Sequence, residues 1–193
     1  MNMPGYQGEL PDVASLAIRS AEGGDVTMFM RDSLDAEVQA QLRTIGQAAS
    51  TEMETALVAR ESGWKVAYER YRVEQRDLGQ MEMEALIDAL ALTPPLPPAI
   101  TRGVLLAAVD LFLRSDDVVI EVHLEGEDVR ISASRCPTLE RFRDQGLDVI
   151  PCGCFARRAG WYEALGLPLD EELMMLLKWD DPACEFIIHV PGP

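Results

Sequence analysis

The N-terminal half of the chain carries hydrophobic residues at the spacing of α-helices. From Ser33 onward, apolar side chains recur every three or four residues, at Leu34, Val38, Leu42, Ile45 and Ala49. Thr51 and Glu54 then have the spacing of a capping box, which predicts that a helix continues or restarts at this point. The pattern therefore predicts either a helical hairpin or one long, kinked helix.

A second helical stretch runs from about Trp64 to Leu92 and consists mainly of strong helix formers. It ends at the segment TPPLPP, residues 93–98, whose four prolines cannot continue a helix and predict a linker or hinge. Residues 99–114 predict one more helix. Because this segment is apolar on almost every side, we expect it to be deeply buried.

After Asp117 the hydrophobic period changes to two, which predicts β-strands. Two alternating segments, 118–124 and 129–134, are joined by the turn sequence EGED and predict a β-hairpin with one face in water. Residues 184–190 alternate in the same way and predict a third strand. Between the hairpin and the last strand we expect three short helices, over Pro137–Gln145, Phe155–Leu165 and Asp170–Lys178.

The order of these elements predicts an α+β fold, in which a helical N-terminal half packs on a small antiparallel sheet of about three strands. We divide the chain into an irregular lead-in over residues 1–32, a helical region over 33–98 and a cysteine-containing α+β region over 99–193. Gly146 and Gly166 stand where C-terminal caps of two short helices belong. With 193 residues and 48% apolar composition, the two structured regions can bury a core as one compact unit.

The charge balance limits the class of partner. Thirty-three acidic and 17 basic residues give a formal net charge of −16, which opposes binding to nucleic acid or to an anionic membrane surface. The longest apolar stretch is too short to span a bilayer, and the N-terminus lacks the features of a secretory signal. We therefore expect a cytoplasmic protein that binds a small molecule, a metal ion or a protein. A homo-oligomer stays open as an alternative.

Three of the four cysteines fall in the segment SRCPTLERFRDQGLDVIPCGCF, residues 134–155. In a cytoplasmic protein these thiols stay reduced, so a cluster indicates metal binding or catalysis before disulfides. Cys136 directly precedes Pro137, and proline is favoured at the first helical position, so we expect Cys136 to be an N-cap residue. There the unpaired backbone N–H groups and the helix dipole would lower the pKa of the thiol.

The other cysteines also lie at boundaries of predicted elements, which can meet at one end of the sheet. The candidate metal ligands are therefore Cys136, Cys152, Cys154 and Cys184. Four thiolates suit a tetrahedral zinc ion, and an iron–sulfur cluster needs the same number of ligands. A reactive thiol without metal and simple apolar packing stay open as alternatives, because the C-x-C spacing is not the C-x-x-C of common zinc sites.

Carboxylates and aromatic residues complete the set of candidate site residues. The candidates for a group that moves a proton are Asp180, Asp181 and Glu163. The candidates to line an apolar pocket for a small molecule, together with several methionines, are Trp64, Tyr68 and Trp161. The common motifs of nucleotide binding, serine hydrolysis and zinc proteases do not occur, so those activities have no support.

Residues 130–190 combine four local features. These are a Cys-Pro that opens a helix at Cys136, a Gly-Leu at Gly146, a Pro-Cys at Cys152 and an acidic-x-x-Cys-x-Phe strand over 181–186. With them, this stretch of about 60 residues resembles the C-terminal half of the L-2-amino-thiazoline-4-carboxylic acid hydrolase-like family. More distantly, it is similar to the 4-vinyl-reductase-type small-molecule-binding domain.

The first resemblance implies a hydrolase that acts on a non-peptide C–N or C–S bond of a small ring or amide. The Cys136 thiolate or a metal ion would drive the attack on a carbon atom. The second resemblance implies a sensor-like module in which Cys136, Cys152 and Cys184 hold a structural zinc beside a ligand pocket. An accessory subunit, whose acidic helices over residues 52–88 contact a protein partner, is the third alternative.

Overall fold

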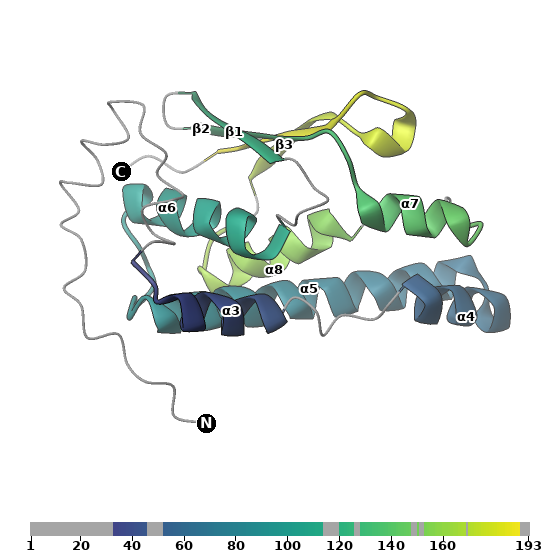
Figure 1. Ribbon diagram of the computed structural model, residues 1–193, viewed down its shortest axis with the longest axis horizontal. Helices are drawn as coiled ribbons and strands as arrows, with labels where there is room; N and C mark the ends of the chain where they lie inside the picture. The colour runs from purple at the N-terminus through teal and green to yellow at the C-terminus, as the bar shows by residue number, and fades with distance from the viewer. Residues whose placement is uncertain are drawn as a thin grey trace.

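The structure of the protein, a computed structural model, describes residues 33–45, 52–113, 120–125, 128–147, 150, 153–168 and 170–189. The expected lead-in over residues 1–32 lies outside this part of the chain. Helices and an antiparallel sheet are stacked in layers, with the sheet on one side and α5 on the other (Figure 1). The α+β fold class is therefore confirmed.

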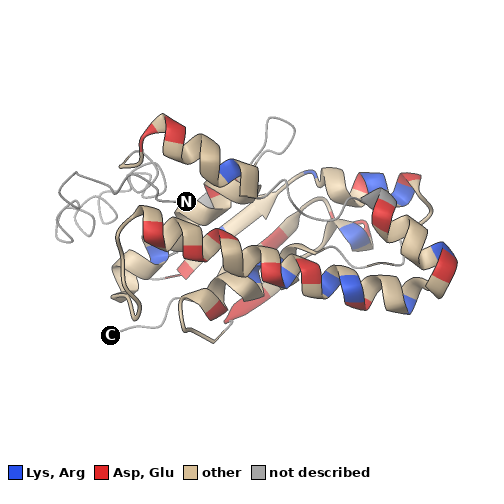
Figure 2. Ribbon diagram, turned by 90° about the horizontal axis from the view of Figure 1, so that it is seen from below, with Lys and Arg blue, Asp and Glu red and all other residues tan. Residues whose placement is uncertain are grey.

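The helical region begins with α3 (Ala36–Ile45) and α4 (Glu52–Ser62), followed by the long helix α5 (Trp64–Ala89). The chain turns between α4 and α5 at Gly63, whose φ of 87° lies in the left-handed region that favours glycine. α4 packs back against α5 as a helical hairpin. The hairpin or kinked helix that the spacing predicts concerns the connection at Thr51, which lies outside the described residues. Acidic and basic residues alternate along the outer side of α5 (Figure 2).

The apolar segment after the prolines forms α6 (Pro98–Ala108), which continues into a short π-helical stretch, η2 (Val109–Leu113). Nearly every side chain in it is buried, including the fully buried Val104 and Ala107. The expected deep burial is confirmed. This segment forms the centre of the main hydrophobic cluster, which also includes residues of α3, α5, α8 and the sheet.

The sheet contains four antiparallel strands in the order β1-β2-β4-β3. Their bounds are Ile120–Glu125 for β1, Asp128–Ala133 for β2, Glu171–Met175 for β3 and Cys184–Ile188 for β4. The predicted hairpin is β1 and β2, which pair over their whole length. The predicted last strand, β4, lies between β2 and β3.

The prediction of a helix over Asp170–Lys178, and with it a sheet of about three strands, is wrong. The segment forms β3, and Leu173 pairs with Phe186 of β4. Its sequence, EELMMLL, is rich in helix formers, but the ladder of hydrogen bonds with β4 outweighs this weak local preference. The buried ion pair between Glu171 and Arg158 also holds the strand against the helix beneath it.

Two of the three predicted short helices are present, as α7 (Pro137–Asp144) and α8 (Cys154–Ala164). Gly146 and Gly166 follow them with φ of 67° and 69°, the left-handed backbone of a C-terminal cap. A second, smaller hydrophobic cluster joins α4, α5 and α7, with Tyr71 and Phe142 in edge-to-face contact at 5.2 Å between ring centroids.

α8 lies directly on α5, and the two helix backbones touch at glycines. A β-carbon at Gly160 would overlap the carbonyl oxygen of Arg76, and one at Gly79 would overlap the carbonyl oxygen of Arg157. Glycine is therefore required on both sides of this crossing. Among the described residues, no helix combines the length and hydropathy that crossing a membrane requires.

Candidate metal centre

Cys136 is the N-cap residue of α7, as the Cys-Pro sequence predicts. Its backbone is extended, Pro137 occupies the first turn, and the Leu139 N–H donates a hydrogen bond to the Cys136 sulfur at 3.4 Å. The thiol thus satisfies one of the backbone donors that the start of a helix leaves unpaired. The cap fixes the direction in which this sulfur points.

Cys154 is the first residue of α8, and the packing of α8 on α5 determines its position. A β-carbon on the preceding residue, Gly153, would lie 2.8 Å from the Tyr71 hydroxyl oxygen, so the chain enters α8 in direct contact with α5. Cys184 is the first residue of β4 and pairs with Ala133 of β2. The three cysteines thus come from three separate elements.

These elements bring two of the three described thiols into a close pair and leave the third at longer range. A hydrogen bond joins the thiols of Cys136 and Cys154, and Cys184 lies within range of electrostatic interaction with both. All three are half-buried and free of disulfides. Cys152, the fourth predicted ligand, lies outside the described residues.

The expectation of a lowered pKa for Cys136 is wrong. The hydrogen bond with Cys154 and the burial of the thiol both raise the pKa of Cys136, and they outweigh the Leu139 N–H, which lowers it. Burial likewise raises the pKa of Cys184, and the neighbouring Cys154 and Asp181 raise it further. A second thiol nearby favours the protonated form of the sulfur. The Cys-Pro sequence predicts the cap but carries no information about this second thiol, Cys154.

The thiol cluster contains one close pair and a third thiol at longer range. Within the described ranges, no three His, Cys, Asp or Glu side chains already stand together as a set of metal ligands. The interactions of Cys184 with the pair are electrostatic and do not imply contact between the sulfur atoms.

The three candidate carboxylates have different surroundings. Asp181 accepts a hydrogen bond from the Leu176 N–H at 2.8 Å and lies near enough to Cys184 to affect its pKa. Asp180 is highly exposed and forms an ion pair with Arg143 at 3.3 Å. Glu163 lies on α8 and accepts a hydrogen bond from Arg76 of α5 at 2.9 Å. Asp181 is thus associated with the thiol cluster, while the other two carboxylates form surface ion pairs.

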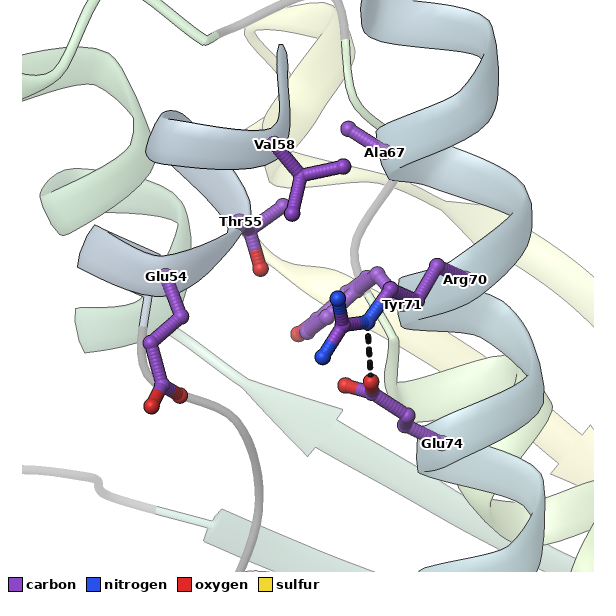
Figure 3. Close-up of a pocket in the computed structure, with 7 residues that line it drawn as sticks. All are labelled: Glu54, Thr55, Val58, Ala67, Arg70, Tyr71 and Glu74. Carbon is purple, nitrogen blue, oxygen red and sulfur yellow. Dashed lines mark hydrogen bonds and ion pairs between the residues drawn. The ribbon is translucent and has the colours of Figure 1, made fainter. Parts of the chain in front are cut away.

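The candidate aromatic residues do not share one environment. Trp64 is 48% exposed and Trp161 is fully buried. Tyr68 packs at the edge of the smaller hydrophobic cluster. A hollow between α4 and α5 is lined by other side chains, including Tyr71 and the hydrogen-bonded pair Arg70 and Glu74 (Figure 3). Its volume of about 10 Å³ is enough for a single water molecule, not for a small-molecule ligand.

Two buried ion pairs that hold α8 against α5 and β3 are not predicted by the sequence patterns. Glu82 of α5 accepts hydrogen bonds from Arg157 and from the Trp161 indole N–H at 3.0 Å. Arg158 donates to both carboxylate oxygens of Glu171, at 2.8 and 2.9 Å, and its guanidinium lies 3.7 Å from the centroid of the Phe186 ring. The signal for both was the adjacent pair of arginines in a helix that is otherwise largely apolar.

The fold and the site together define an α+β protein with a cluster of reduced thiols at the starts of two helices and a strand. Comparisons with protein-family models, curated proteins and solved structures find no match for this chain. The resemblance to the thiazoline carboxylate hydrolase-like family therefore stays a prediction from its motif residues. Any assignment of function depends on the chemistry of the site.

Proposed function

We propose that the protein binds a zinc ion through Cys136, Cys154 and Cys184, and that the ion has a structural role. The observation that carries the proposal is the hydrogen-bonded pair of free thiols at the starts of α7 and α8, with the Cys184 thiol at the start of β4 near enough to interact electrostatically with both. Cysteine thiolates are common ligands of structural zinc sites, and such sites contribute directly to the stability of the fold. Here the ion would connect α7 and α8 with the sheet.

The surroundings of the thiols also support a structural role. α8 is held by the two buried ion pairs, and the Arg158 guanidinium lies near enough to Cys184 to counter part of the rise in its pKa. A cation nearby favours the thiolate form that a metal requires. Cys152, two positions before Cys154 in the sequence, would be the natural fourth thiolate, and its contribution is open to direct test.

The zinc content of the purified protein tests the proposal. We expect anaerobically purified protein to be colourless and to contain about one zinc ion per chain, measured by elemental analysis. Replacing Cys136, Cys154 or Cys184 with serine should lower the zinc content by about tenfold or more, because each variant removes a ligand. Ser134→Ala, an exposed change two residues from Cys136, is the matched control and should retain the metal.

Wild-type protein that takes up no zinc, even when refolded with it, would contradict the proposal. If the purified protein is brown and contains iron, the site holds an iron–sulfur cluster instead of zinc. Cys152→Ser then decides the fourth ligand, because Co²⁺ bound in place of zinc absorbs visible light with an intensity that depends on the number of thiolates.

Zinc affinity should rise with pH. The hydrogen bond with Cys154 and burial raise the pKa of Cys136, so the thiols hold protons at neutral pH that the metal must displace. Raising the pH removes this competition, and the affinity should increase by about tenfold per pH unit for each proton released. Competition with a coloured chelator at pH 6, 7 and 8 measures the slope. An affinity that does not change over this range would contradict protonated thiol ligands.

Hydrolysis of a small ring or amide is the second candidate function, and the position of Asp181 beside Cys184 favours it. The discriminating substrate is L-2-amino-thiazoline-4-carboxylate. Turnover that disappears in both Cys136→Ser and Asp181→Asn, while Glu163→Gln retains it, would assign a catalytic role to the thiol cluster. If zinc-loaded wild-type protein does not turn over this compound, the structural role of the zinc ion is the function that stays proposed.

A further inference from the structure

The thiols of Cys136 and Cys154 join the starts of two helices. Cys136 is the N-cap residue of α7, and Cys154 is the first residue of α8. The two thiols share a hydrogen bond, so their sulfur atoms are neighbours. Both residues are half-buried free cysteines, which a small reagent in the solvent can reach. The pair therefore combines the proximity and the access that an intramolecular disulfide requires.

One side chain of α5 supports both members of the pair. The Tyr71 ring packs edge to face on Phe142 of α7, at 5.2 Å between the ring centroids. The Tyr71 hydroxyl group lies against Gly153, the residue before Cys154, because a β-carbon there would be 2.8 Å from its oxygen. Tyr71 is buried, so both contacts belong to the core. The core thus holds the starts of α7 and α8 together, on the side of α5 that faces the sheet (Figure 1).

The Cys184 thiol is not an equal member of this group. It comes from β4, where it pairs with Ala133 of β2, and its interaction with the two other thiols is electrostatic. Among the three described cysteines, the geometry therefore favours one disulfide, between Cys136 and Cys154. The loop that it closes runs over residues 136–154 and connects α7 with α8.

We propose that Cys136 and Cys154 are a site of reversible oxidation, at which a disulfide between them displaces the zinc ion. The disulfide itself needs no metal, whereas the displacement rests on the function proposed above. The oxidant is a small-molecule disulfide. One thiolate of the pair attacks a sulfur atom of the oxidant and releases a small thiol. The second thiolate then attacks the protein sulfur of this mixed disulfide and releases the other small thiol. Two electrons and two protons thus pass from the pair to the oxidant.

Oxidation would change the zinc site directly. Zinc binds thiolate sulfur, and neither sulfur atom of a disulfide is a thiolate, so the reaction removes two of the three described ligands. Cys184 by itself does not make a zinc site. In the reduced protein the ion connects α7 with α8, and in the oxidised protein the disulfide makes the same connection. The two helices are thus joined in either state, while the metal is bound in only one.

A tryptic digest without reductant tests for the disulfide. Trypsin cleaves after arginine, which separates residues 136–141 from residues 144–157. After metal-free wild-type protein has reacted with oxidised glutathione, we expect mass spectrometry to find these two peptides joined. Cys136→Ser and Cys154→Ser should each lower the yield of the joined peptides by about tenfold or more, because each removes one of the two sulfur atoms.

The matched controls are Cys152→Ser and Cys184→Ser, which should keep the joined peptides at the wild-type yield. Cys152 is the more stringent control, because it lies in the same tryptic peptide as Cys154. Joined peptides that persist in Cys154→Ser, or that disappear in Cys152→Ser, would overturn the pairing. So would wild-type protein in which the two peptides stay separate.

Release of zinc tests the displacement. Zinc-loaded wild-type protein should transfer its zinc to a coloured chelator about tenfold faster or more in oxidised glutathione than in reduced glutathione. Dithiothreitol should then restore zinc binding. Protein that forms the disulfide and still retains its zinc would overturn the displacement. Joined peptides from a chain that never binds zinc would support the disulfide and contradict the proposed zinc site, so the two proposals fail separately.

Discussion

Replacement of Gly160 with alanine is expected to remove a large part of the stability of the fold. In the interior of an ordinary helix the same change stabilises a protein by up to about 1 kcal/mol, because alanine is the better helix former. Here the new methyl group would overlap the Arg76 carbonyl oxygen and crowd the Gln80 amide nitrogen, both in the backbone of α5. A side chain could rotate away, but a helix backbone cannot, so α5 and α8 must separate.

Separation of these helices would disturb the core that both of them cover. We expect a loss of about 3 kcal/mol or more, from a total that is typically about 5 to 15 kcal/mol. Urea unfolding followed by circular dichroism measures it. Gly146→Ala is the control. Its φ of 67° is unfavourable for alanine, but no atom lies within 4 Å of the new methyl group, so it should cost only about 1 to 2 kcal/mol. Equal losses of unfolding free energy in the two variants would show that the close backbone contact of α5 and α8 does not cause the loss in Gly160→Ala.

Replacement of Glu82 with leucine is expected to have an effect of similar size. The Glu82 side chain is fully buried and accepts hydrogen bonds from Arg157 and from the Trp161 indole N–H. Without the carboxylate, a largely buried guanidinium is left without its partner. Breaking a buried ion pair in this way costs about 3 to 5 kcal/mol. The change in the free energy of unfolding, again from urea titration, gives the measured value.

Two further variants separate the buried charge from other effects of this substitution. Glu82→Leu combined with Arg157→Leu should recover part of the lost stability, because no unpaired charge remains. Glu163→Ala breaks the exposed ion pair between the same two helices and should cost less than about 1 kcal/mol. A double variant that is as unstable as the sum of its single variants would argue against the buried pair as the cause.

The features that sequence patterns predicted correctly are local ones. The burial of α6, the β-hairpin, the last strand and the glycine caps each follow from a few neighbouring residues. The N-cap role of Cys136 depends only on the proline beside it. The error at β3 has the opposite cause, since EELMMLL favours a helix locally and becomes a strand because β4 lies beside it.

The candidate site required contacts between residues far apart in the chain. The sequence by itself determined which cysteines stand at element boundaries, because capping and strand alternation are local properties. Only the tertiary structure decided that Cys136 and Cys154 share a hydrogen bond and that Asp181 lies near Cys184, whereas Glu163 pairs with Arg76. The close backbone contacts of Gly79 with Arg157 and of Gly160 with Arg76, and the burial of Glu82, were likewise decided by packing. Both features result from the packing of α8 on α5, which the spacing of residues within either helix does not predict.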